Sequence, residues 1–239
     1  MWLKKTVAAV IPAAANKDMI FNVIQELDAT SYVDEVIAVD NGVDAETLSQ
    51  IKKTRARFVK QKKYGFGRAI KTGIKSTKAD LIIITEPTGT FKGEDISKLL
   101  SYSEDFDCVF GSRTHIPLIA KGSGMTFLRR IVDDIFGKII SILFLSSNLT
   151  DVGCTFRLTN RKGWRKVAKE CKSDGELFLT QWLIAAAKNR VRFIEIPVNF
   201  AASKVDREKE RLPYLAIRGL LIFCYIIKTW FVHLTSKSN

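Results

Sequence analysis

The sequence lacks several features that would assign it to a class at once. Its 239 residues include only four cysteines and two histidines, and no two cysteines form a Cys-x-x-Cys pair. This absence argues against a zinc ribbon and favours a reducing compartment. The N-terminal apolar run imitates a secretory signal, but it is short and contains Pro12, so we interpret Val7–Pro12 as a buried strand. A hydrophobic content of 46% with 26% charged residues excludes wholesale disorder.

Acidic residues are scarce relative to basic ones. The chain has 38 Lys and Arg against 25 Asp and Glu, which gives a net charge of +13. Such an excess predicts an anionic partner, either a nucleic acid, a nucleotide or an acidic membrane surface. Ten of the basic residues lie in Lys52–Lys75, which contains no acidic residue. Few aromatic side chains are interspersed there and no known reading module is present, so we expect no nucleic-acid partner and keep nucleic-acid binding only as an alternative.

Short apolar runs alternate with segments of helical period. The runs that predict strands are Val7–Ile11, Val36–Val39, Leu81–Thr85, Asp107–Gly111 and Phe193–Val198. The segments between the first three runs that predict helices are Met19–Ala29, Ala45–Lys53 and Gly67–Ser76. Continuous apolar strands separated by helices are typical of a sheet covered on both faces. The pattern predicts a doubly wound α/β domain with a mostly parallel sheet, whose ligands bind at the carboxyl ends of the strands.

Two further segments are more apolar than a soluble domain requires. Phe127–Leu145, within residues 125–145, has a broad apolar face opposite a charged one. A second helix is predicted from Pro213 onward, and its longest uncharged stretch, Gly219–Ile227, has nine residues. About 20 residues are needed to span a bilayer, so we expect a helix in the membrane interface. The alternative is packing on the sheet or on a partner subunit, which leaves a homo-oligomer possible.

A series of motifs follows the expected strand ends in a distinctive order. They read VIP, VDNG, YGFGRAIKTG, EPTGTF, GSR, DVGCTFRL and EIPV. Over roughly residues 6–204 this series resembles family 2 glycosyltransferases with the GT-A fold. More narrowly, it is similar to the dolichol-phosphate mannose synthase and polyprenyl-phosphate glycosyltransferase branch. The resemblance implies a GT-A domain over residues 1–204, including the helix at 125–145. Residues 205–239 would then be a charged connector and a C-terminal amphipathic, membrane-associating helix.

The resemblance implies an inverting transfer of a sugar from a UDP- or GDP-linked donor to a polyprenyl or dolichyl phosphate. The reaction would take place at the cytoplasmic face of a membrane, to which the protein is attached in a peripheral or monotopic way. Positions that match the family's donor-binding residues are Pro12, Ala13, Asp40, Asn41, Gly65, Gly67, Lys71, Thr88 and Lys204. By this resemblance Asp40 and Asn41 hold the base and ribose, while Lys204 approaches the donor diphosphate.

The catalytic positions come from the same resemblance. Arg113 and Arg130, with Arg129 as the alternative to Arg130, would hold the acceptor phosphate, and Glu86 would hold Mg²⁺ or Mn²⁺. A polyprenyl phosphate is already an anion, so no general base is required. Had the acceptor been a sugar hydroxyl, Asp174 or Glu176 would be the candidate base, although both are also suited to a helix N-terminus.

The metal motif departs from the family pattern. The usual Asp-x-Asp is Glu86-Pro87-Thr88 here, so one carboxylate is replaced by a hydroxyl. Hard divalent cations prefer carboxylate oxygens, which makes this a weak site on its own. Three interpretations follow: metal held mainly through the substrate, neutralisation by basic residues such as Lys71 and Lys204, or a degenerate glycosyltransferase fold retained as a binding or scaffold protein.

Overall fold

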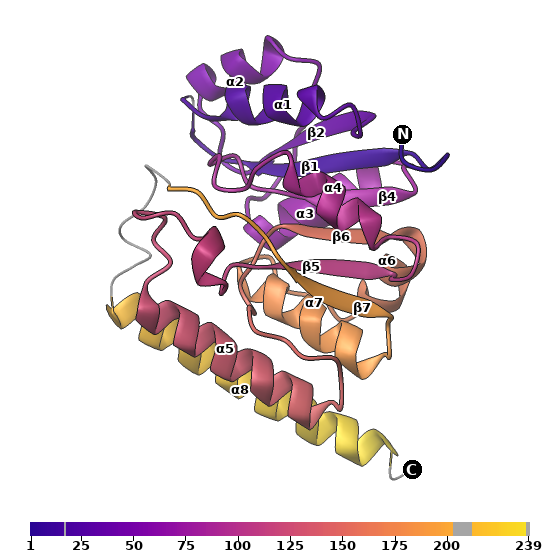
Figure 1. The fold of residues 1–239 in the computed structure, drawn as a ribbon, viewed down its shortest axis with the longest axis vertical. Coiled ribbons are helices and arrows are strands. Elements are labelled where there is room, and N and C mark those ends of the chain that lie inside the picture. The colour runs from indigo at the N-terminus through magenta and orange to yellow at the C-terminus, as the bar shows by residue number, and fades with distance from the viewer. Residues whose placement is uncertain (17, 203–211, 238–239) are drawn as a thin grey trace.

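The computed structural model describes residues 1–16, 18–202 and 212–237, and these build one mixed sheet between helices (Figure 1). Seven strands lie in the order β3-β2-β1-β4-β6-β5-β7. Their bounds are β1 Val7–Ala13, β2 Glu35–Asp40, β3 Arg57–Val59, β4 Leu81–Ile84, β5 Cys108–Ser112, β6 Arg157–Asn160 and β7 Phe193–Pro197. All five strands expected from the apolar runs are therefore present, and β3 and β6 are additional.

The sheet is parallel except at β6. This strand lies between β4 and β5 and is antiparallel to both, whereas β1 pairs in parallel with β2 and β4. The short β6 begins with Arg157, whose side chain is fully buried, so its sequence has no apolar run that would have predicted a strand. The fold is thus the expected α/β GT-A arrangement with a mostly parallel sheet.

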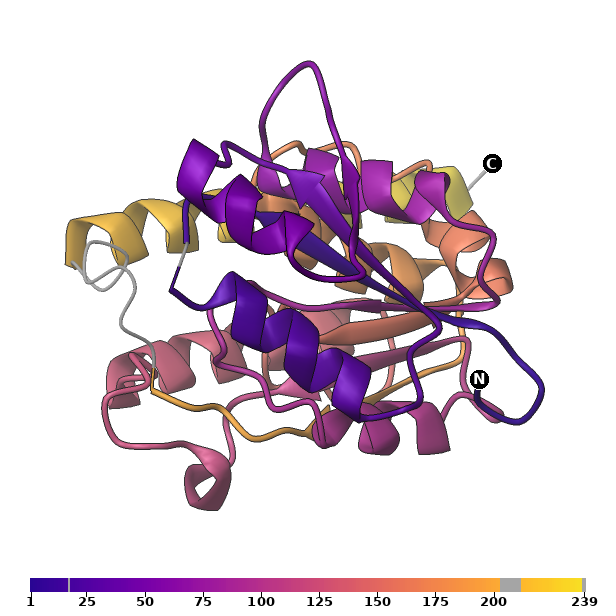
Figure 2. The same ribbon diagram turned by 90° about the horizontal axis from the view of Figure 1, so that it is seen from above.

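Helices cover both faces of the sheet, as the two views together show (Figures 1 and 2). On one face lie α1 (Ile20–Ala29), α2 (Ala45–Lys52) and α4 (Asp95–Ser101), and on the other lie α3 (Phe66–Ser76), α6 (Arg161–Val167) and α7 (Leu177–Lys188). In β1, Val7, Ala9 and Ile11 belong to one apolar cluster, whereas Ala8 and Val10 belong to the other. A strand buried on both faces has to be apolar at every position, which explains the continuous apolar run.

Two long helices form a pair beside the α7 layer. They are α5 (Phe127–Leu143) and α8 (Leu212–Lys237), drawn in pink and yellow in Figure 1. The helices α5 and α8 contact each other, and each also contacts α7. The side chains of Ile222 and Ile226 are buried in the cluster beneath, which fastens α8 to the domain.

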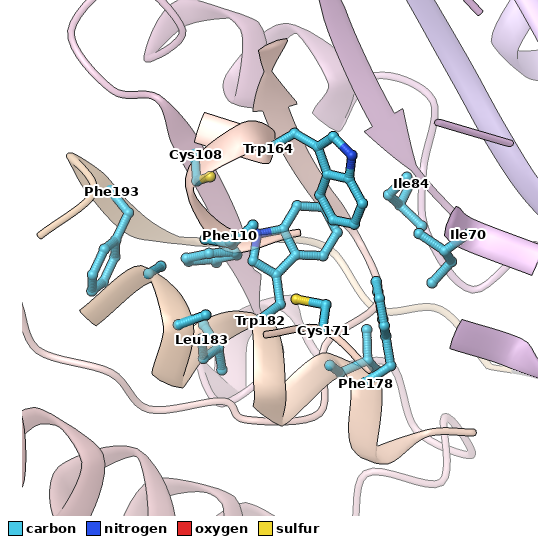
Figure 3. Close-up of a cluster of buried hydrophobic side chains, with 14 of the residues drawn as sticks. Ile70, Ile84, Cys108, Phe110, Trp164, Cys171, Phe178, Trp182, Leu183 and Phe193 are labelled. Carbon is cyan, nitrogen blue, oxygen red and sulfur yellow. The ribbon is translucent and has the colours of Figure 1, made fainter. Parts of the chain in front are cut away.

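Aromatic side chains from β5, α6 and α7 form a buried cluster (Figure 3). Trp182 lies against Trp164 with ring centroids 5.1 Å apart, and against Phe110 at 6.3 Å. The guanidinium of Arg157 sits 5.0 Å from the Phe110 ring centre, and it donates hydrogen bonds to the carbonyl oxygens of Cys154 and Leu179 at 2.7 Å each. The buried arginine therefore ties the loop before β6 to α7.

Candidate functional site

A cavity of about 620 Å³ opens at the carboxyl ends of β1, β2 and β4. Pro12 from the end of β1, Asn41 directly after β2 and Glu86 two residues after β4 all line it. This is the edge at which a doubly wound sheet binds its ligands, because the strand ends leave loops and helix N-termini facing one crevice. The cavity thus lies at the edge of the sheet where the strand pattern predicts that ligands bind.

Asp40 and Asn41, the two residues expected to hold the nucleoside, make different contacts in the turn after β2. Asp40 Oδ1 accepts hydrogen bonds from the backbone N–H groups of Gly42 and Val43 at 3.2 Å each, so this carboxylate shapes the turn. Gly42 has φ +91°, a conformation that favours glycine. Asn41 Oδ1 accepts a hydrogen bond from the Gly65 N–H at 2.7 Å, and Asn41 lines the cavity, whereas Asp40 is not among its lining residues.

The glycine-rich segment before α3 makes contacts within the protein. A Cβ on Gly65 would lie 2.6 Å from the Asp174 carbonyl oxygen, and one on Gly67 would lie 2.5 Å from Cβ of Phe178. Because these glycines have no side chain, the segment that leads into α7 can pack directly against them. None of Gly65, Gly67 and Lys71 is among the lining residues of the cavity.

Lys71 and Asp174 belong to the same internal contact. Lys71 Nζ donates to the carbonyl oxygens of Lys172 and Ser173 at 3.1 Å and to Asp174 Oδ1 at 3.0 Å, and Arg68 pairs with Asp174 as well. Hydrogen bonds from Lys71 and Arg68 lower the pKa of Asp174, which makes this carboxylate a poor general base. Glu176, the other base considered, lines the cavity.

Glu86 lies within a group of threonine hydroxyls. Thr155 donates to Glu86 Oε1 at 2.5 Å, Thr88 donates to Oε2 at 3.3 Å, and the Thr88 and Thr90 hydroxyl oxygens are 2.9 Å apart. No group of three or more His, Cys, Asp or Glu side chains in the described residues could hold a metal ion. One carboxylate with hydroxyls fits Mg²⁺ or Mn²⁺ only when a substrate diphosphate supplies further oxygen ligands.

Arg113 is locked into a buried ion pair. Its backbone N–H and Nε both donate to Asp151 Oδ2, and its Nη2 donates to Oδ1, each at 2.8 Å. Burial alone would lower the pKa of Arg113, but the Asp151 charge raises it well above its ordinary value, and the same pairing holds the pKa of Asp151 low despite burial. Both groups are therefore ionised, and Asp151 neutralises most of the Arg113 charge.

Glu195 supports this pair from β7. Its carboxylate accepts hydrogen bonds from the Thr150 N–H at 2.6 Å, the Thr150 hydroxyl at 2.8 Å and the Asp151 N–H at 2.9 Å. Burial, followed by the nearby Asp151 charge, raises the pKa of Glu195 to about 8. At neutral pH Glu195 is mainly protonated and adds little negative charge to the site.

Two further arginines line the cavity beside Arg113. Arg129 comes from the first turn of α5 and Arg218 from α8. Asp133 lies 3.7 Å from Nη2 of Arg113, and burial together with the Asp151 charge raises the pKa of this carboxyl. Burial and repulsion by Arg113 lower the pKa of Arg129. A cluster with more arginines than ionised carboxylates attracts an anion.

Some of the positions expected from the sequence line the cavity, and others do not. Lining residues that were expected are Pro12, Asn41, Glu86, Thr88 and Arg113. Expected residues outside the lining are Ala13, Asp40, Gly65, Gly67, Lys71 and Arg130. Lys204 lies outside the described residues. Of the two neighbouring arginines on α5, Arg129 lines the cavity, whereas the guanidinium of Arg130 lies 5.9 Å from the centre of the Phe127 ring.

Several lining residues were not expected from the sequence. They include Arg218, Gly153 and Thr155. Gly153 and Thr155 belong to the DVGCTFRL motif. The sequence of this motif does not indicate which distant part of the chain lies against it. Arg218 comes from the C-terminal helix α8, whose mainly apolar sequence gives no sign that one of its charges lines a cavity.

The helices α5 and α8 leave much of their apolar surface exposed. Exposed apolar side chains on them are Phe127, Leu128, Ile131, Ile135, Ile142, Ile217, Leu220, Leu221, Phe223, Phe231, Val232 and Leu234. Residues Ala216–Thr235 have a mean hydropathy of 1.5 and are long and apolar enough to cross a membrane. We call this combined surface the apolar face of α5 and α8. Clusters of exposed apolar side chains are typical of surfaces that contact a membrane or a partner.

The stretch Lys52–Lys75 gives weak support to nucleic-acid binding. Arg55 pairs with Asp28 at 2.5 Å, Arg57 pairs with Glu35 at 2.6 Å, and Arg68 and Lys71 are paired as described above. Four of the ten basic residues are therefore engaged by the chain's own acids, which lowers the charge offered to a phosphate backbone.

Comparison with known proteins agrees with the geometry. The family model described as Glycosyl transferase family 2 matches residues 8–167. A UDP-N-acetylglucosamine–dolichyl-phosphate N-acetylglucosaminyltransferase of Methanococcus voltae is 23% identical over 217 residues, covering 81% of this chain and 85% of that protein. An uncharacterised protein of Methanocaldococcus jannaschii is 24% identical over 211 residues, covering 82% of this chain and 81% of that protein.

Solved structures share the fold. Glucosyl-3-phosphoglycerate synthase of Mycobacterium tuberculosis, with Mn²⁺, UDP and glucosyl-3-phosphoglycerate bound, superposes with a TM-score of 0.71 at 14% identity. The match covers 95% of this chain and 80% of that one. The same enzyme has also been solved with Mg²⁺ and UDP, with a TM-score of 0.70. At this identity the likeness concerns the fold.

Proposed function

The chain belongs to glycosyltransferase family 2, and we propose that it transfers a sugar from a UDP-linked donor to a polyprenyl phosphate at the cytosolic surface of a membrane. One observation carries this proposal: two of the three arginines that line the cavity, Arg129 and Arg218, come from α5 and α8, the two helices whose apolar face is exposed. An acceptor with an anionic head and an apolar tail fits that junction. The relatives favour UDP, because the Methanococcus voltae enzyme is named for UDP-N-acetylglucosamine and the Mycobacterium tuberculosis synthase has been solved with UDP bound.

The reaction is a single displacement. An oxygen of the acceptor phosphate attacks the anomeric carbon, the bond from that carbon to the diphosphate breaks, and UDP leaves with the electron pair. Because the acceptor oxygen is already anionic, no side chain has to remove a proton. The protein aligns the two substrates and stabilises charge on the leaving diphosphate.

Glu86 marks the donor side of the cavity. Its hydrogen bonds with Thr155 and Thr88 hold the carboxylate in place at the end of β4. We propose that Glu86, together with diphosphate oxygens, holds Mg²⁺ or Mn²⁺ there. When bound, the cation would neutralise the leaving group.

The contacts of α8 favour a helix that lies in the membrane interface. Near its start Arg218 reaches Gly153, in its middle Ile222 and Ile226 are buried, and near its end the His233 ring lies 5.8 Å from that of Phe144. At 1.5 Å per residue this attachment extends over roughly 22 Å of helix. A helix fastened to the domain over that length lies beside α5 rather than crossing the bilayer away from it.

The transfer itself is tested with purified protein, a panel of UDP-sugars and farnesyl phosphate in detergent, with Mn²⁺ or with EDTA. We expect one UDP-sugar to yield a glycosyl-phosphate lipid detected by mass spectrometry, and more of it with Mn²⁺. Transfer to 3-phosphoglycerate but not to farnesyl phosphate would overturn the lipid acceptor. Binding of UDP without transfer to any acceptor would favour a binding or scaffold protein.

Membrane attachment is tested by flotation with vesicles that contain anionic lipid. Ile142→Asp and Ile217→Asp each place a charge on the apolar face of α5 and α8, where the side chains are 70% and 63% exposed. Both variants should float less than the parent protein. Leu3→Asp is the matched control, because Leu3 is also exposed but lies near the N-terminus, away from both helices (Figure 1). Equal loss in all three variants would contradict the proposed surface.

A further inference from the structure

Thr155 comes from a distant part of the chain and fixes the carboxylate of Glu86. Its hydroxyl donates to Glu86 Oε1 at 2.5 Å, while Thr88, from the same turn as Glu86, donates to Oε2 at 3.3 Å. Thr155 is only 2% exposed, and it lines the main cavity together with Glu86. The direction of the Glu86 carboxylate therefore depends on the position of the loop Asp151–Thr155, which precedes β6.

Arg157 holds this loop by its backbone. Its Nε donates to the carbonyl oxygen of Cys154 at 2.7 Å, and its Nη2 donates to that of Val152 at 3.4 Å. Its Nη1 donates to the carbonyl oxygen of Leu179 in α7 at 2.7 Å, and Leu179 also lines the cavity. Three nitrogens of one rigid, planar guanidinium thus fix the residue directly before Thr155 relative to α7.

Stability alone gives little reason for a charge at this position. Arg157 is fully buried beside the rings of Phe110 and Trp182, whose centres lie 5.0 and 5.8 Å from its guanidinium; Figure 3 shows these two rings. Within the described residues its hydrogen bonds all go to carbonyl oxygens, and burial lowers its pKa to about 10, so it stays charged at neutral pH. Taking a charge out of water without a carboxylate partner is costly, and a packed apolar side chain would avoid that cost.

From these contacts we infer that Arg157 is a positioning residue: by holding Cys154 it places the Thr155 hydroxyl where it orients Glu86 for a divalent cation. This inference rests on the proposed function, in which Glu86 and diphosphate oxygens hold the cation. Groups that orient a metal ligand without touching the metal typically change metal affinity about 10–100-fold. Because the turn Glu86–Thr90 contains a single carboxylate, its orientation matters more than it would in a site with two.

The test measures the affinity for UDP by calorimetry, once with Mn²⁺ and once with EDTA, and we call the ratio of the two the Mn²⁺ gain. Thr155→Val keeps the shape of the side chain but removes its hydroxyl, so it should lower the Mn²⁺ gain about ten-fold or abolish it. Thr155→Ser keeps a hydroxyl and should restore most of the gain. Arg157→Met should lower the gain as Thr155→Val does. The affinity in EDTA should stay unchanged in all three, which reports that the fold is intact.

Arg161→Met is the matched control for a purely structural arginine. Arg161 also donates to three carbonyl oxygens, those of Ala79 at 2.8 Å, Ile74 at 3.2 Å and Thr77 at 2.5 Å. These contacts lie before β4, at the opposite end of that strand from Glu86. The control should lower Tm, as Arg157→Met should, but leave the Mn²⁺ gain unchanged. An equal loss of the gain in Arg161→Met would show that loss of stability is the cause and would overturn the inference.

A double variant tests whether Arg157 acts through Thr155. Because both residues serve one contact, Arg157→Met combined with Thr155→Val should lower the Mn²⁺ gain no further than Thr155→Val alone. Additive losses would contradict the inference. Should Arg157→Met fail to fold, Arg157→Lys takes its place, since it keeps the charge but offers one nitrogen instead of three. It should lose part of the gain, and a gain equal to that of the parent protein in either Arg157 variant would reject the inference.

The transfer assay separates this inference from the proposed function. Sugar transfer to farnesyl phosphate, with a Mn²⁺ gain that no Arg157 variant lowers, would leave the proposed function in place and reject the inference. A gain that depends on Arg157 and Thr155, without transfer of any sugar, would do the reverse. A parent protein without a Mn²⁺ gain would overturn the role of Glu86 and the inference together, while the glycosyl-phosphate product would still decide the reaction.

Discussion

The buried pair of Arg113 and Asp151 supplies a strong stability test. Asp151→Asn preserves the shape of the side chain but removes its charge. The Asp151 carboxylate accepts four hydrogen bonds, three from Arg113 at 2.8 Å and one from the Gly153 N–H at 3.0 Å. Arg113 is only 2% exposed, and after the substitution its nearest carboxylate would be Asp133, 3.7 Å away. The variant would therefore hold a buried guanidinium with little compensation.

Removing one partner of a buried ion pair costs about 3–5 kcal/mol of folding free energy. For a domain of this size each kcal/mol lowers Tm by about 2–4 °C, so Asp151→Asn should lower Tm by roughly 6–20 °C. Arg113→Met should cost less, because Asp151 would keep its hydrogen bond from Gly153 and the one from the backbone N–H of residue 113. The order of the two losses follows from which charge is left unpaired.

The assay is unfolding by urea and by heat at pH 7 in one buffer. Asp134→Asn is the control, because it removes the same negative charge from an exposed position. Asp134 on α5 is 45% exposed and lies 3.8 Å from Lys138. Exposed pairs of this kind contribute about 0–1 kcal/mol. A loss below about 1 kcal/mol for Asp151→Asn, or a larger loss for Arg113→Met, would refute the reasoning from buried charge.

Three further predictions concern packing, pH and metal. Gly137→Ala should lower the free energy of unfolding by about 1–3 kcal/mol, because its Cβ would overlap the Leu149 carbonyl, whereas Gly175→Ala, with its nearest neighbour atom at 4.0 Å, should be close to neutral in urea unfolding. Burial raises the pKa of Glu195 to about 8. The contribution of its protonated carboxyl to the free energy of unfolding is therefore complete below the unfolded pKa near 4.5 and is lost as pH rises to 8. Glu195→Gln should therefore gain stability relative to the parent protein by up to about 1.4 kcal/mol per pH unit across that window, measured by urea unfolding at several pH values. Glu86→Gln should abolish the increase in UDP affinity caused by Mn²⁺ and leave the affinity in EDTA unchanged, measured by calorimetry; a retained Mn²⁺ effect would show that the cation is held elsewhere.

The sheet could be predicted where burial on both faces imposes a continuous apolar run. In β1 every residue is buried, and the pattern is unambiguous. The strand β6 could not be found in this way, because Arg157 and Thr159 are buried polar residues whose partners come from distant parts of the chain. Its antiparallel direction also depends on tertiary pairing with β4 and β5, which no local pattern encodes.

Some residues of the candidate site could likewise be predicted from the sequence and others could not. Residues at strand ends, such as Asn41 and Glu86, could be placed because parallel strands bring their carboxyl ends together. The glycines of the segment before α3 could not be interpreted, since a glycine that admits a ligand and one that admits the protein's own backbone look the same in the sequence. Here the neighbour is Asp174, more than a hundred residues away in the chain.

Arg218 shows why the arginine side of the cavity was harder to predict from the sequence than the strand ends. In the sequence it is one charge in an apolar helix, and its meaning comes only from Gly153, which leaves the space that it fills. Arg113 is neutralised by Asp151, so the charge available to a ligand lies on Arg129 and Arg218, one from each helix of the exposed apolar pair. A soluble acceptor would need no connection between its anion site and an apolar face. For the proposed lipid phosphate the connection is necessary, because the head has to reach the anomeric carbon while the tail stays in the membrane, and the two helices with exposed apolar side chains are the ones that carry Arg129 and Arg218.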